Sequence, residues 1–149
     1  MPEMKFGRYD YGAFLTFSCY AACSLVVPIS LVQVANSLHF PLGEGGMGAG
    51  GALHMGRSIA LVAAMILCGF ASGRWGNCRT IGWALIFMVA GMLIGAFSPV
   101  YAVLFMGLLV AGFGEGFVEG LATPLIQDLH KDEPGRYINF SHGFWSVGV

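Results

Sequence analysis

Long apolar segments separated by short polar stretches dominate the hydropathy pattern of this chain. The first, residues 11–35, contains no charged residue and is longer than the roughly 20 residues that a helix needs to cross a bilayer. Further apolar segments cover residues 52–71, 81–97 and 100–126, and a fifth runs from residue 138 to residue 149. This pattern predicts an all-α integral membrane protein with four spans and the start of a fifth.

The fifth apolar segment is too short to cross a membrane. As a helix, residues 138–149 would rise only about 18 Å, whereas the hydrocarbon core of a bilayer is about 30 Å thick. We therefore expect a chain that is truncated within its fifth helix.

Composition excludes several classes of protein. Of 149 residues, 56% are hydrophobic and 10% are charged, whereas a soluble domain carries about 25% charged residues. The net charge of −1 and the lack of a basic patch argue against a nucleic-acid partner. The four cysteines form no CxxC pair, and most lie in apolar segments, which favours buried thiols over disulfides or metal ligands. No motif predicts a metal or another cofactor.

The basic residues predict an orientation in the membrane. Six of the seven lie in alternate connecting segments, and therefore on one side: Lys5, Arg8, Arg74, Arg79, Lys131 and Arg136. By the positive-inside rule this side is cytoplasmic, so we expect a cytoplasmic N-terminus and a location in the plasma (inner) membrane. The seventh, Arg57, is expected to extend its side chain to the nearer membrane surface.

Polar and glycine-rich stretches predict the loops between the spans. Residues 36–51, with a run of glycines from Gly43, are expected to form an outward-facing loop. Residues 69–79 are expected to form a short basic loop on the cytoplasmic side.

The fourth segment carries two acidic residues, Glu115 and Glu119. Their spacing of four places both on one face of a helix, one turn apart. A carboxylate inside a span is costly and marks a proton or substrate pathway by default. The alternative is a structural role near the cytoplasmic end. Glu119 lies about 7–8 Å along the axis from Pro124, which is a long way for its short side chain to reach the surface.

Glycines recur every four residues in the same segment, at Gly112, Gly116 and Gly120. Small residues at this spacing allow two helix backbones to approach closely. The pair Gly91 and Gly95 in the third segment predicts a second close contact of this kind.

The segment between the second and third spans resembles a signature of the major facilitator superfamily. It contains Gly69, Gly73, Arg74, Gly76 and Arg79 at the spacing of that loop motif. Gly73 stands where the family signature has an acidic residue.

A second stretch resembles the fucose–proton symporter branch of the same superfamily. The positions that match are Glu119, Pro124, Arg136, Asn139 and Gly148. Thr123 replaces an asparagine of that branch, and Ser24 stands where the first helix of that branch carries an acid.

The resemblance implies an incomplete N-terminal six-helix bundle of a major facilitator superfamily transporter. It implies a carrier, not an enzyme, that moves a small polar solute such as a sugar by alternating access with proton or sodium coupling. The implied partners are the solute, the coupling ion, the lipid bilayer and the missing C-terminal half. By this resemblance, Glu119 and Asn139 are candidate residues for substrate or proton coupling.

Two further candidates come from their position in the chain. Glu115 lies nearer the middle of the fourth span, and His142, near the start of the fifth, could hydrogen-bond a sugar, relay a proton or only pack between helices. The alternative function is a small four-span multidrug exporter that works as a homo-oligomer. The incomplete fifth segment argues against it.

Overall fold

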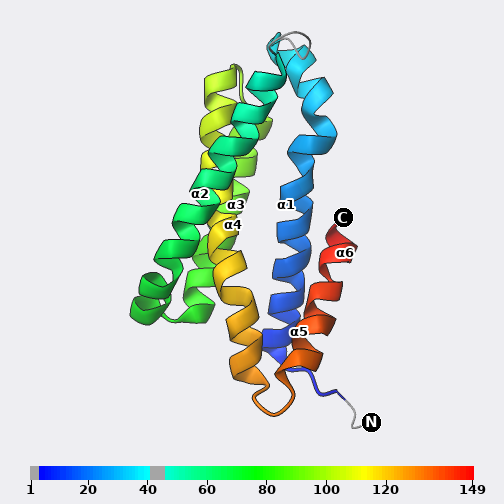
Figure 1. Cartoon of the computed structure of the whole chain (residues 1–149), viewed down its shortest axis with the longest axis vertical. Coiled ribbons are helices and arrows are strands. Elements are labelled where there is room, and N and C mark those ends of the chain that lie inside the picture. Colours follow the sequence, from blue (N-terminus) through cyan, green and yellow to red (C-terminus); the bar gives the residue numbers. More distant parts are fainter. Residues whose placement is uncertain (1–3, 41–45) are drawn as a thin grey trace.

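The computed structural model describes residues 4–40 and 46–149, and Figure 1 shows a bundle of helices. Its four long helices are α1 (Arg8–Leu38), α2 (Gly46–Trp75), α3 (Asn77–Ala96) and α4 (Tyr101–Leu129). Two short ones follow, α5 (Pro134–Gly143) and α6 (Trp145–Gly148), and these lie beside the N-terminal half of α1. All four long helices are long and apolar enough to cross a membrane, which confirms the predicted all-α membrane fold.

The loops are much shorter than the sequence predicted. Of the first expected loop, residues 36–38 belong to α1 and residues 46–51 to α2, while residues 41–45 lie outside the described residues. The prediction of a second loop at residues 69–79 is wrong as well, because only Gly76 separates α2 from α3. Its φ of +83° is in the region that favours glycine, so the chain turns there in a single residue. Hydropathy marks the apolar part of a helix, whereas the backbone stays helical through polar flanks.

Three prolines lie inside or at the start of helices without ending them. Pro28 is within α1, and α4 continues through Pro124 to Leu129 instead of ending near it. The fifth segment begins at Pro134, four residues before the expected start, because proline is well suited to the first turn of a helix. It is interrupted at Phe144, after which α6 begins.

Helix α4 is packed closely on α2 through the predicted glycine seam. A Cβ atom added at Gly112 would overlap the carbonyl oxygen of Arg57, and one at Gly116 would overlap that of Leu61. At Gly120 an added Cβ would lie 2.6 Å from the sulfur of Cys68. The seam therefore brings two backbones together, as its spacing predicted.

A second face of α4 packs on α3. A Cβ at Gly91 would overlap the backbone of Ala111, and one at Gly107 would lie 2.8 Å from the nitrogen of Gly95. The predicted Gly91 and Gly95 contact is thus a contact with α4, which lies against both α2 and α3.

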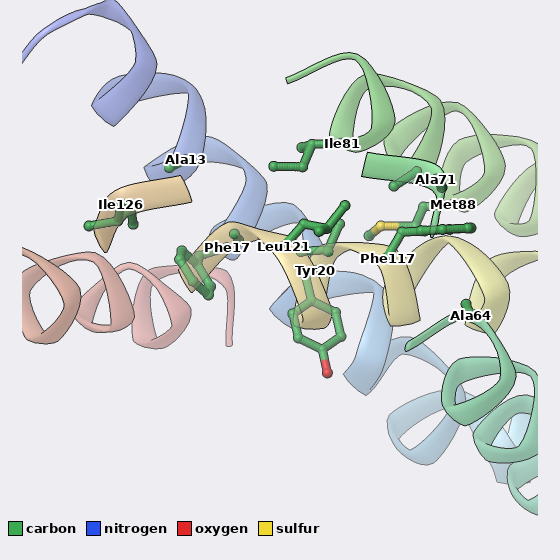
Figure 2. Close-up of a cluster of buried hydrophobic side chains, with 13 residues drawn as sticks. Ala13, Phe17, Tyr20, Ala64, Ala71, Ile81, Met88, Phe117, Leu121 and Ile126 are labelled. Atoms are coloured by element: carbon green, nitrogen blue, oxygen red, sulfur yellow. The ribbon is translucent and has the colours of Figure 1, made fainter. Parts of the chain in front are cut away.

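The main apolar cluster follows α4 and reaches α1, α2 and α3 (Figure 2). From α4 it takes Phe117, Leu121 and Ile126, and from α1 it takes Phe17 and Tyr20. The Tyr20 ring carries its hydroxyl away from the other labelled side chains (Figure 2).

We expect Gly116→Ala to destabilise the bundle by about 1–3 kcal/mol, the usual cost of overpacking. The added methyl group would meet backbone atoms of α2, which cannot rotate away. Thermal unfolding of the purified chain in detergent measures the effect. Gly82→Ala is the control, because its Cβ would meet no atom within 4 Å. Equal melting temperatures for the two variants would contradict this account of the seam.

Candidate functional site

A buried ion pair joins α2 to α4. The Arg57 guanidinium donates from Nη2 and Nε to Oε2 of Glu115, at 2.6 and 2.9 Å. The two side chains are 8% and 0% exposed. The expected extension of Arg57 to the membrane surface is therefore wrong. A charged side chain inside an apolar layer needs a partner, and the carboxylate on the adjacent helix provides one here.

The same guanidinium also reaches α1. Its Nη1 donates to the backbone carbonyl of Ser24 at 2.9 Å, so one side chain links three helices. The second carboxylate oxygen of Glu115, Oε1, is buried and has no hydrogen-bond partner among residues 4–40 and 46–149. Glu115 therefore faces the interior of the bundle and is committed to Arg57.

Glu119 has different surroundings, although it lies only one turn from Glu115. It is exposed and lines a cavity of about 360 Å³, together with side chains from α1, α5 and α6: Phe17, Tyr20, His142 and Trp145. The structure thus brings two of the predicted site residues together, Glu119 and His142. Glu115 and Asn139 are not among the residues that line this cavity.

Aromatic contacts hold the walls of this cavity. The Tyr20 and Trp145 rings meet edge to face, with centroids 4.7 Å apart, and the His142 ring lies 4.8 Å from that of Phe17. The Tyr20 side chain and the Glu119 carboxylate line the same cavity. His142 Nε2 lies 3.3 Å from the Thr123 hydroxyl of α4.

This combination of groups suits a small amphipathic solute. Aromatic faces and edges can contact C–H surfaces, whereas the carboxylate and the imidazole can hydrogen-bond hydroxyl groups. A mostly apolar wall with a few convergent polar groups is the usual composition of a ligand pocket.

A second polar cluster, which the sequence did not predict, connects the ends of α1, α4 and α5. His130 Nε2 lies 2.7 Å from Oδ1 of Asp10, and Oδ2 of Asp10 accepts a bond from the Gly7 amide. The His130 ring stacks on Tyr137 at 3.5 Å, and the Tyr137 hydroxyl accepts from the Lys5 amide. No spacing rule could have revealed it, because the partners are far apart in the chain.

The loop-motif residues gather around the junction of α2 and α3. Arg74 and Arg79 are exposed, and within the described part of the chain neither forms an ion pair. Gly69 and Gly73 have open space around them, while Gly76 forms the turn itself. These residues lie apart from the cavity that Glu119 lines.

The chain matches a profile described as Major Facilitator Superfamily over residues 12–149. No curated protein and no solved structure gives a significant match. The profile covers all six helices except the first turn of α1.

Substitution of one partner of the ion pair should cost more than substitution of both. Arg57→Met leaves the Glu115 charge buried without a partner, for which we expect a loss of about 3–5 kcal/mol in the free energy of unfolding. Arg57→Met combined with Glu115→Leu should recover part of that loss, because no charge remains.

Melting temperatures of the two single variants and the double variant in detergent form the test. If the double variant loses as much as the two single variants together, the two side chains do not interact in the folded chain.

Proposed function

Because this chain belongs to the Major Facilitator Superfamily, a family of membrane transporters, we propose that it carries a solute site of a secondary transporter. The solute is small and polar, a sugar by its chemistry, and it moves by alternating access with coupling to protons or sodium. Glu119 is the central residue of this site.

The observation that supports the proposal is the cavity between α1, α4 and the α5–α6 segment. It is the place where an intramembrane carboxylate, an imidazole and three aromatic rings meet. A carboxylate at that depth needs a partner, and in this cavity a solute hydroxyl or a coupling cation can supply one. The mixture of rings and hydrogen-bonding groups favours a sugar over a wholly apolar compound.

The two acidic residues of α4 then have separate roles. Glu115 is paired with Arg57 and supports the site through helix packing. Glu119 contacts the solute or the coupling ion, and His142 provides a second hydrogen-bonding group in the lining of the cavity. Asn139 is exposed one turn from His142, and we propose that it contacts parts of the carrier other than this cavity.

Alternating access requires two bundles that rock against each other around a central site. We therefore propose that a second bundle, the C-terminal half of the carrier, closes the open side of the Glu119 cavity.

Glu119→Gln in the complete carrier tests the role of the carboxylate. The substitution keeps the size of the side chain but removes its charge and its titration. If Glu119 couples transport to an ion, uptake driven by a pH or sodium gradient is lost while solute exchange survives. If it binds a hydroxyl group, exchange falls about tenfold or more as well, since an unmet hydrogen bond costs about 1–3 kcal/mol.

Membrane vesicles with imposed gradients and a panel of radiolabelled monosaccharides provide the measurement. Glu133→Gln is the matched control, because Glu133 is exposed and forms an ion pair with Arg136, three residues along the chain. Gradient-driven accumulation at the wild-type level by the Glu119→Gln carrier would rule out both roles.

We also propose that the N-terminus and the α2–α3 junction face the cytoplasm. Cys78, at the start of α3, is exposed and free, so it reports on that junction. A membrane-impermeant maleimide should label Cys78 only after cells are permeabilised. Labelling of Cys78 in intact cells would reverse the proposed orientation.

A further inference from the structure

Pro28 leaves one backbone carbonyl of α1 without its helical donor. In an α-helix each amide N–H bonds to the carbonyl four residues earlier, and proline has no N–H to give. The carbonyl that loses its donor here is that of Ser24. Within an apolar span no water is available to replace the missing bond, so the carbonyl needs a donor from elsewhere in the protein.

Arg57 is that donor. Its Nη1 lies 2.9 Å from the Ser24 oxygen, while Nε and Nη2 bind Glu115. The side chain of Ser24 is used differently, because its hydroxyl donates to the Ala21 carbonyl. The rigid fork of the guanidinium is what allows one side chain to serve an acceptor on α1 and an acceptor on α4 together.

This bond is a polar link between two helices whose other contact is apolar, with Leu31 of α1 beside Gly50 of α2 and with Val27 and Leu53 in one buried cluster. Helix α2 packs on α4 along the glycine seam, and the close backbone contacts of α1 are mainly with α4, α5 and α6, with a smaller contact to α3. In the part of the chain that the structure describes, the bond from Arg57 to Ser24 is the only hydrogen bond between α1 and α2.

We propose that Arg57 is a positioning residue for the solute site. By donating to the carbonyl that Pro28 frees, it fixes the turn of α1 that carries Tyr20, one helical turn before Ser24. Tyr20 faces both Trp145 and Glu119 in the cavity. The importance of this role for transport rests on the proposed function, whereas the geometry does not.

The test restores the missing donor. Pro28→Ala returns an amide N–H to position 28, so the Ser24 carbonyl no longer depends on Arg57. Arg57→Lys keeps a positive charge beside Glu115 but removes the fork. Trp145 is the reporter once Trp75→Phe and Trp83→Phe have removed the other two tryptophans.

The emission of Trp145 is recorded on the purified chain in detergent, well below its melting temperature and without any solute. We expect Arg57→Lys to shift the emission maximum to the red, because Tyr20 moves away from the indole. In the Pro28→Ala background the same substitution should give a markedly smaller shift. Arg74→Lys, an exposed arginine at the end of α2, is the matched control and should give no shift in either background.

Equal red shifts in both backgrounds would overturn the proposal, because Arg57 would then act through Glu115 alone. No shift in either background would overturn it too. If Arg57 only stabilised the fold, Arg57→Lys would lower the melting temperature, and Pro28→Ala would not reduce the shift in Trp145 emission. That result would also contradict the proposal.

If Arg57→Lys does not yield folded protein, Arg57→Met combined with Glu115→Leu replaces it. That pair removes both charges, so the Ser24 carbonyl is the main polar group left unpaired. Its red shift should also diminish in the Pro28→Ala background, and a shift that persists unchanged would contradict the proposal. Since no solute is present, these outcomes are independent of whether the carrier transports a sugar.

Discussion

The structure depends on one constraint, which is that polar groups inside an apolar layer must find their partners within the protein. Three such groups meet at the middle of this bundle: the charge of Arg57, the charge of Glu115 and the Ser24 carbonyl. The Arg57 guanidinium donates hydrogen bonds to both the Glu115 carboxylate and the Ser24 carbonyl, and the carboxylate balances its charge. The result is a polar centre that ties α1 to α2 and α4.

The faces of helix α4 have different roles. One glycine face lies against α2 and another against α3, so these three helices form a tight unit. The face with Glu119 turns instead toward α1 and the α5–α6 segment, where aromatic rings and His142 leave a cavity. The close packing on two faces gives the third face a rigid support, which a binding site needs if its polar groups are to stay in place.

Much of the fold was predictable because it depends on local patterns. Apolar length predicted the four spans, and spacing predicted the seams of Gly112, Gly116 and Gly120 and of Gly91 and Gly95. Helix ends were missed, because small and polar residues can remain helical and hydropathy does not report backbone conformation. Arg57 was misjudged for another reason: its partner lies 58 positions away, and only the register between α2 and α4 brings the two to the same depth.

The candidate site was predictable only in part. Glu119 and His142 were each identified singly, but their meeting at one cavity depends on how α5 folds back along α1. Asn139 matched a family pattern and lies outside that cavity. No sequence pattern predicted the pair of Asp10 and His130, because the two residues are 120 positions apart in the chain.

The central claim is that Glu115 is committed to the interior while Glu119 is open to a solute. Carbodiimide labelling of the unmodified chain in detergent, followed by peptide mass spectrometry, measures this directly for both carboxylates. Glu119 should be modified rapidly, whereas Glu115, fully buried and held by Arg57, should stay unmodified until the chain unfolds. Modification of Glu115 at the same rate as Glu119 in the folded chain would contradict the claim.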